Sequence, residues 1–242
     1  MGKSCESCGG GPFKFCPFSL FLFVTTSAAY GKYMLSSSSV VKKEEKKKDQ
    51  VVFVLGGPGA GKGTQCELIT QRIEGWAHLS AGDLLRAERK KADSKLGELI
   101  NSKIAAGQIV PSEITVRLLR NAMEEIRSST GKSKFLIDGF PRSDENATTW
   151  NEQMPDSVAV VEMVLFLDCP EDTMTSRLLE RGQTSGRNDD NLEVIRKRFE
   201  TFRKESMPIV EMYQGQNKVK TVKTDRSPEE IYKDIETILS PL

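Results

Sequence analysis

Residues 51–64 read VVFVLGGPGAGKGT, an apolar run followed by a glycine-rich loop with a lysine and a threonine at its end. Glycines allow a tight turn in which several backbone N–H groups point at one anion, and a helix that follows adds its positive N-terminal end. Lys62 would bring a mobile positive charge to a phosphate, and Thr64 a hydroxyl. Because an apolar strand precedes the loop and a helical stretch follows it, the pattern predicts a phosphate-binding loop, with an ordinary glycine-rich turn as the alternative.

Strands alternate with helices outward from this loop. Residues 51–55, 135–137, 164–167 and, more weakly, 219–222 are apolar runs with the character of buried strands. Residues 114–126 and 192–202 carry apolar side chains three and four positions apart, which is the spacing of helices. This alternation predicts an α/β fold in which helices cover a parallel sheet, and we find no internal repeat.

The composition restricts the class of partner. The 242 residues include 35 Lys and Arg against 34 Asp and Glu, so the chain as a whole lacks the positive surplus that nucleic-acid binding needs. Cys5 and Cys8 have a CxxC spacing, but only Cys16 lies nearby and a structural zinc site usually needs four ligands. We therefore expect no nucleic-acid partner, and reduced thiols rather than a disulfide framework.

The first 49 residues differ in composition from the rest, which predicts an N-terminal extension (1–49) ahead of a core (50–242). Up to residue 41 the extension has one acidic residue and many serines, and its apolar run at 18–24 is too short to span a bilayer. It has features of a targeting peptide and of a disordered segment, and both readings stay open. Residues 42–49, KKEEKKKD, predict a solvated hinge.

One detail of the loop indicates which class of phosphate-binding protein the chain resembles. The common pattern has Ser or Thr directly after the lysine, whereas Gly63 follows Lys62 here and Thr64 comes one position later. This form resembles the adenylate kinase family of nucleoside monophosphate kinases. Three more segments resemble the same family, so that the likeness covers about residues 51–240; they are HLSAGDLLR at 78–86, GQIVP at 107–111 and FLIDGFPR at 135–142.

The resemblance implies the three-layer fold of P-loop NTPases, with a small helical arm at about 83–110 for the nucleoside monophosphate and a short lid at about 181–191. It also implies transfer of a phosphoryl group from ATP to that monophosphate. The residues implied to bind ATP are Gly59, Ala60, Gly61, Lys62, Gly63, Thr64, Arg181 and Arg226. Those implied to bind the monophosphate are Ser80, Ala81, Arg86, Gln108, Ile109, Val110, Gly139, Phe140, Pro141, Arg142, Asn146, Arg187 and Arg198.

Five arginines lie between residues 177 and 198, and cations placed there would stabilise the charge of a phosphoryl group in transfer. By the family pattern Arg181 faces ATP, while Arg187 and Arg198 bridge the transferring phosphate and the acceptor. Asp189 and Asp190 would hold these arginines, and the small residues of the lid predict mobility. The implied catalytic residues are Lys62, Arg142, Arg181, Arg187 and Arg198. A solvated charged helix is the alternative, above all for Arg177 and Arg196.

The resemblance implies Mg²⁺ bound with ATP, with Thr64 and Asp138 reaching the ion through water. A surface salt bridge is the alternative role for Asp138 and Arg142. No side chain stands out as a general base, and none is needed, because a phosphate acceptor is already a nucleophile. The lid has no cysteine cluster, which excludes the zinc-bearing lid of some adenylate kinases.

Two positions bear on the choice of monophosphate. Adenylate kinases usually carry Thr where this chain has Ala81 and Gln where it has Asn146, and both choices here resemble UMP-CMP kinases. We therefore predict UMP, CMP and dCMP as acceptors, with an AMP-specific kinase and a non-catalytic nucleotide sensor as alternatives. His78, Cys66 and Cys169 are predicted to be packing residues. We expect a monomer without a stable membrane span in the cytoplasm or nucleus, with a mitochondrion or plastid as the alternative.

Overall fold

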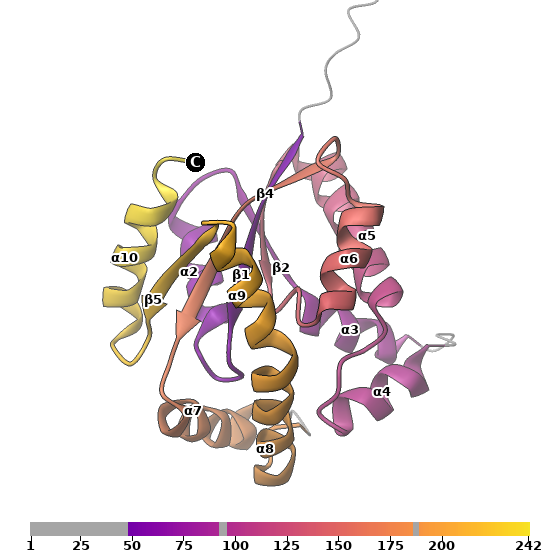
Figure 1. Ribbon diagram of the computed structural model, residues 1–242, viewed down its shortest axis with the longest axis vertical. Coiled ribbons are helices and arrows are strands. Elements are labelled where there is room, and N and C mark those ends of the chain that lie inside the picture. The colour runs from indigo at the N-terminus through magenta and orange to yellow at the C-terminus, as the bar shows by residue number, and fades with distance from the viewer. Residues whose placement is uncertain (1–47, 92–95, 186–188) are drawn as a thin grey trace, which may run out of the picture. The chain divides into compact units, whose positions relative to one another are not determined.

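A computed structural model describes residues 48–91, 96–185 and 189–242, in which five parallel strands form one sheet (Figure 1). The strand order is β2-β3-β1-β4-β5. The strands are β1 (Asp49–Gly56), β2 (Trp76–Ser80), β3 (Lys134–Asp138), β4 (Ala159–Asp168) and β5 (Val219–Lys223). Because all pairs are parallel, the carboxyl ends of the strands meet at one edge, where ligands of open α/β sheets bind.

Helices cover both faces of this sheet, which confirms the predicted α/β fold. Along β1, Val51 and Phe53 pack in one core cluster and Val52 and Val54 in the other, so the strand is apolar on both faces. The first cluster is covered by α5 (Ser112–Thr130), α6 (Asp144–Gln153) and α9 (Met207–Gly215). The second is covered by α2 (Lys62–Arg72), α7 (Glu171–Thr184), α8 (Leu192–Thr201) and α10 (Pro228–Leu239).

The segment predicted to form the acceptor arm has a small core of its own. It contains α3 (Ala81–Lys90) and α4 (Gly97–Ala105), and Leu85, Ile100 and Val110 form its buried cluster. Leu96, Ile104, Ile114 and Leu118 pack against that cluster. Because Ile114 and Leu118 belong to α5, the arm rests on the first turns of a helix that also covers the main sheet.

Two features of the backbone were not predicted from the sequence. The segment 76–80 forms strand β2 at one end of the sheet order, although it has no long apolar run. The predicted helix at 192–202 is confirmed as α8, but it continues as a π-helical turn, η1 (Phe202–Ser206), into α9. Such turns are frequent at functional sites, and this one lines the cleft described below.

The predicted solvated hinge is wrong at its last residue. Asp49 is the first residue of β1, is 1% exposed and accepts a hydrogen bond from Arg127 Nη1 of α5 at 2.8 Å. Its backbone N–H donates to Val158 O at 3.0 Å. The strand therefore begins one residue earlier than the predicted core boundary, because an ion pair takes up the buried carboxylate.

The ion pair between Asp49 and Arg127 predicts that two N-terminal truncations differ in their free energy of unfolding. We expect a chain starting at Lys48 to match the full chain in kcat/KM, since the site described below uses only residues after β1 begins. A chain starting at Gln50 should lose about 1–3 kcal/mol of unfolding free energy, measured with urea, because Arg127 loses its buried partner. Glu124→Gln, which removes the exposed partner of Arg127, is the control and should cost less than about 1 kcal/mol. Equal stability of the two truncated chains would contradict the role of Asp49.

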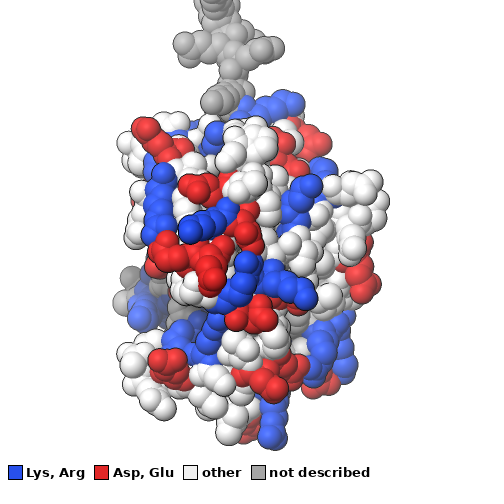
Figure 2. All heavy atoms as spheres, turned by 90° about the vertical axis from the view of Figure 1, so that its left-hand side faces the viewer, with Lys and Arg blue, Asp and Glu red and all other residues white. Residues whose placement is uncertain are grey.

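Charges on the described surface are mixed. Figure 2 shows acidic and basic side chains interspersed on the face that carries α10 and β5. Exposed ion pairs there join Arg72 of α2 to Glu229 of α10, and Arg226 to Asp234. Within the described residues, no helix combines the length and the apolar character that a membrane span requires.

Candidate active site

The glycine-rich loop follows β1 at the carboxyl edge of the sheet and ends at Lys62, the first residue of α2. Gly59 and Gly61 have φ angles of +89° and +90°, which side chains other than glycine rarely allow. A Cβ on Gly59 would also lie 2.6 Å from Met174 O of α7. The loop is thus fixed by conformation and by close packing, with the start of α2 facing the cleft.

Lys62 folds back over this loop. Its Nζ donates to Gly56 O and Gly57 O, both at 2.9 Å, so the ammonium lies where a bound anion would meet it. Loss of hydration on burial lowers the pKa of Lys62 to about 8, and the cations Arg142 and Arg198 act in the same direction, while Asp138 opposes them.

Two arginines occupy the predicted acceptor side. Arg86 of α3 donates from Nη2 and Nε to Asp83 Oδ1, at 2.6 and 3.1 Å, and Ser80 caps the start of that helix. Arg142 follows β3 and donates from Nε to Gly139 O at 2.7 Å. Desolvation, with the nearby Arg198, lowers the pKa of Arg142 to about 10, although solvent in the cleft still reaches its side chain.

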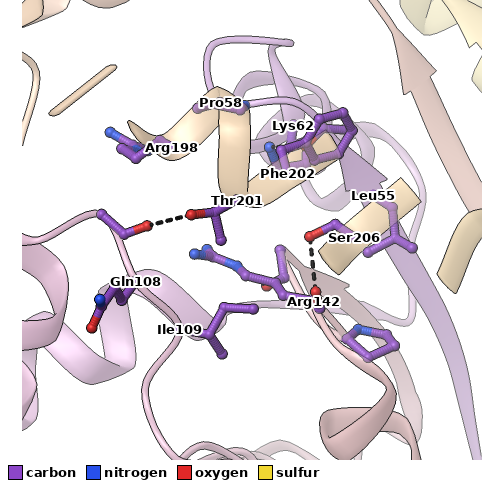
Figure 3. A pocket seen from close by; sticks show the side chains of 14 residues that line it. Leu55, Pro58, Lys62, Gln108, Ile109, Arg142, Arg198, Thr201, Phe202 and Ser206 are labelled. Atoms are coloured by element: carbon purple, nitrogen blue, oxygen red, sulfur yellow. Dashed lines mark hydrogen bonds between the residues drawn. The ribbon is translucent and has the colours of Figure 1, made fainter. Parts of the chain in front are cut away.

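The backbone around Arg142 is tied to the π-helical turn. Ser206 Oγ donates to Arg142 O at 2.9 Å, and Thr201 Oγ1 donates to Gly107 O at 3.0 Å (Figure 3). The first contact holds the loop that carries Arg142, and the second holds the end of the predicted arm. Both hydroxyls come from one continuous helical segment, α8 with η1, which therefore links the two parts of the acceptor side.

The lid arginines are held as predicted by two buried aspartates. Arg181 Nε and Nη2 donate to the two carboxylate oxygens of Asp190 at 2.7 and 2.8 Å. Arg198 Nη1 donates to Asp189 Oδ2 at 2.9 Å and to Asp190 Oδ1 at 3.0 Å. The pKa of Arg181 is raised, chiefly by its bonds to Asp190, whereas desolvation lowers the pKa of Arg198, which lies deeper. Arg187 lies outside the described residues.

The lid is less loop-like at its start than predicted. Arg181 and Gly182 belong to the last turn of α7, which ends at Thr184. A Cβ on Gly182 would come within 2.8 Å of Asp190 O, so this glycine allows close packing of the segment that carries the aspartate. In the structure Gly182 allows the close approach of Asp190 to Arg181, while the mobility expected from the small residues of the lid stays a prediction.

These groups converge on one cleft. Three adjoining cavities, with open volumes of about 560, 620 and 1500 Å³, all include Arg142 and Arg198 in their lining. Figure 3 shows Lys62, Arg142 and Arg198 around the first of them, with Gln108 and Ile109 on its other side. The largest cavity is lined by the predicted donor residues Gly59, Gly61, Lys62, Gly63, Thr64 and Arg181, and also by Ser80, Arg86 and Asp138. The second is lined by Ala81, Arg86, Gln108, Ile109, Val110, Gly139, Phe140 and Asn146.

Comparison with known proteins agrees with this geometry. The family described as "Adenylate kinase" matches residues 54–218. The chain belongs to the adenylate kinase family. It is 54% identical over 186 residues to the protein named uridylate kinase of Saccharomyces cerevisiae, covering 77% of this chain and 88% of the yeast protein. It is 51% identical over 191 residues to UMP-CMP kinase of Danio rerio, covering 78% and 96% of the two chains. UMP-CMP kinase of Xenopus tropicalis is 53% identical over 189 residues, at 78% and 95% coverage.

Three further residues were assigned from the resemblance to this kinase family. Ala60 is fully buried in the core, so only its backbone can meet a phosphate. Pro141 lines the first cavity beside Arg142. Arg226 lies beside a separate surface depression, where its guanidinium pairs with Asp234 of α10 and donates to Lys223 O. The structure does not bring Arg226 into the cleft, and its role in ATP binding stays a prediction.

Arg177 is a cleft residue that the sequence analysis did not assign to the site. It lines the largest cavity from α7, one turn before Arg181. Its Nη2 donates to Thr224 O at 2.9 Å, and its Nη1 lies 3.6 Å from Cys169 Sγ. The spacing of four residues from Arg181 was the available signal, because it places both side chains on one helical face.

Of the three residues predicted to be packing residues, two lie in the core and one lines the cleft. Cys66 is fully buried in the core beneath α2, and Cys169 is 9% exposed in the same cluster. His78 instead lines the largest cavity, with Nε2 3.8 Å from Asp138 Oδ2. The prediction is confirmed for both cysteines, whereas His78 of β2 is a wall residue of the cleft, because β2 ends at the same edge as β3.

The residues of the cleft fit a magnesium ion that is bound mainly by water and phosphate. Thr64 and Asp138 line the same cavity, and a Cβ on Gly63 would lie 3.9 Å from Asp138 Oδ2, so loop and carboxylate are close. No three His, Cys, Asp or Glu side chains gather as a metal cage in the part of the chain that the structure describes. Mg²⁺ usually keeps several waters and takes one or two carboxylates together with substrate phosphates.

The low pKa of Lys62 predicts a pH profile. Above pH 8 the free enzyme loses the Lys62 charge, so kcat/KM for ATP should fall by about tenfold per pH unit. The kcat at saturating ATP should stay level to higher pH, because bound phosphate favours the protonated lysine. Initial rates from pH 7 to 10, with products separated directly, check this. A kcat/KM that stays level to pH 9.5 would contradict it.

Proposed function

We propose that the chain transfers the γ-phosphoryl group of MgATP to UMP, CMP and dCMP, giving ADP and the nucleoside diphosphate. The observation that carries this proposal is that Lys62, Arg142 and Arg198 line one cavity, between the glycine-rich loop and the acceptor arm. These three cations come from α2, from the loop after β3 and from α8. No aspartate or glutamate is among the described residues that line this cavity. Such a site suits the phosphate chain of a donor placed end to end with the single phosphate of an acceptor.

Each cation has a part in the transfer. Lys62 and the N–H groups of the loop hold the donor phosphates, while Arg86 and Arg142 orient the acceptor phosphate. Arg198 and Arg181, held by Asp189 and Asp190, and Arg187 of the lid stabilise the charge that spreads over the moving group. Mg²⁺ bound with ATP would neutralise phosphate charge, with Thr64 and Asp138 reaching it through water. No side chain has to remove a proton, because the acceptor phosphate is itself the nucleophile.

The acceptor cavity supports a pyrimidine base. Ala81 and Asn146 line it, 2% and 1% exposed, together with Val110 and Phe140. Ala81 offers no hydroxyl with which a purine could form a hydrogen bond. The side chain of Asn146 is shorter than that of glutamine, which suits a base with a single ring. The names of the similar proteins, uridylate kinase and UMP-CMP kinase, point to the same substrates. A monomeric state and a cytoplasmic or nuclear location stay predictions.

The experiment uses the full chain with MgATP and one acceptor at a time. ADP release should depend on UMP, CMP or dCMP and be much slower with AMP. A preference for AMP would favour the adenylate kinase alternative. Nucleotide binding without ADP release, measured by calorimetry beside the assay, would favour the non-catalytic sensor.

A further inference from the structure

Asn146, predicted to meet the base, is also a structural residue. It lies in the first turn of α6, where its backbone N–H donates to the capping Ser143 Oγ at 3.2 Å. Its side-chain Oδ1 accepts from the backbone N–H of Arg142 at 3.1 Å, and its Nδ2 donates to Ser112 Oγ at 2.7 Å. Ser112, the first residue of α5, is 1% exposed, as is Asn146.

These bonds fix which way the amide points. A backbone N–H can only donate, so the Arg142 N–H requires the oxygen of Asn146 on its side. Nδ2 then faces Ser112, whose hydroxyl takes one of its two hydrogens. The second N–H has no protein partner among the described residues, and the side chain lines the acceptor cavity. The second N–H of Asn146 Nδ2 therefore remains as an oriented hydrogen-bond donor for a base.

From this geometry we infer that Ser112 is a positioning residue for pyrimidine recognition: it holds the Asn146 amide so that one N–H stays directed to the base. The inference rests on the proposed function. Uracil and cytosine share a carbonyl oxygen at C2, so one donor can serve both bases, which a site for UMP and CMP requires. The contact also joins two helices, since Ser112 follows the edge at 107–111 and Asn146 follows the Arg142 loop.

The alternative is a purely structural contact between α5 and α6, and the kinetic constants separate the two. A directed donor acts on binding of the pyrimidine base alone and leaves kcat unchanged. A loosened loop at Arg142, which orients the acceptor phosphate, would weaken binding of every nucleoside monophosphate and would lower kcat as well. Without the Ser112 hydroxyl, the Arg142 N–H still selects the oxygen end of the amide, but Nδ2 loses the contact that fixes its direction, and the buried N–H turns toward another acceptor. The effect should therefore appear in the KM for the acceptor.

The test compares Ser112→Ala with wild type in full steady-state kinetics. We expect the KM values for UMP and CMP to rise by about 5- to 20-fold, with kcat and the KM for ATP within about twofold. Ser112→Thr, which restores the hydroxyl, should recover most of the loss. Thr149→Ala, a buried threonine of α6 outside the cavity lining, is the matched control and should leave both KM values unchanged.

The inference is overturned if the acceptor KM values do not move, if kcat falls with KM unchanged, or if Ser112→Thr behaves like Ser112→Ala. If Ser112→Ala does not fold, Ser112→Cys keeps the volume with a weaker acceptor and should give a smaller rise in the same constants. A wild-type chain that does not phosphorylate pyrimidine nucleotides would instead remove the proposed function, so the two failures are distinguishable.

Discussion

Lys62→Met should lower kcat by about 1000-fold, with UMP or CMP as acceptor and saturating MgATP. Methionine has a similar length, but it can neither neutralise the charge of the donor phosphates nor replace the bonds of Nζ to Gly56 O and Gly57 O. The fold should survive, because Lys62 lies at the start of α2 on the wall of the cleft and outside the core clusters. Initial rates and thermal unfolding, measured on the same preparation, check both parts.

Lys132→Met is the matched control. Lys132 is also partly buried and also donates from Nζ to a backbone carbonyl, Trp76 O at 3.0 Å, but it does not line the cleft. Its replacement should leave kcat within about twofold, since no phosphate lies nearby. A Lys62→Met enzyme with near-normal kcat would exclude the role of Lys62 in phosphoryl transfer.

The second large effect concerns Asp190. Asp190→Asn should lower kcat by about 100-fold, because one fully buried carboxylate holds both Arg181 and Arg198. Asparagine keeps one acceptor oxygen but turns an N–H toward two guanidinium groups that can only donate. Both arginines would then leave the positions in which they stabilise the transferring phosphate.

Glu193→Gln gives the comparison for this variant. Glu193 lies three residues further along and forms an exposed ion pair with Lys197 at 2.7 Å. An exposed pair contributes little, so kcat should not change. Unfolding in urea shows whether Asp190→Asn is still folded when its rate is measured. Equal kcat for Asp190→Asn and wild type would mean that Arg181 and Arg198 act without this anchor.

The sequence predicted most where a chemical function requires several residue types at fixed spacing. The glycine-rich loop with Lys62, and the strand that leads to Asp138 and Arg142, are such segments, and the structure places all three side chains in one cleft. The aspartates that hold the lid arginines were also predicted, since a carboxylate beside a cluster of cations has few other roles. These inferences depend on local patterns that tertiary contacts do not change.

Other features depend on residues far apart in the chain. Asp49 looked like the end of a charged hinge, and only Arg127, 78 positions later, makes it a buried residue. Strand β2 lacks an apolar run and takes its conformation from pairing with β3. The amide of Asn146 is shared with Ser112, 34 positions away, which no sequence spacing indicates. Arg226 was assigned by resemblance, yet its guanidinium pairs with Asp234 of α10 beside a separate surface depression.

The central claim is phosphoryl transfer from ATP to pyrimidine nucleoside monophosphates, and a competition assay tests it most directly. UMP, CMP and AMP, each carrying a radioactive base, are mixed at equal concentration with limiting MgATP, and the labelled diphosphates are separated by anion-exchange chromatography. We predict that labelled UDP and CDP exceed labelled ADP by about 100-fold, because Ala81 offers no hydroxyl to a purine and the short amide of Asn146 suits a single-ring base. Labelled ADP as the main product would contradict the account.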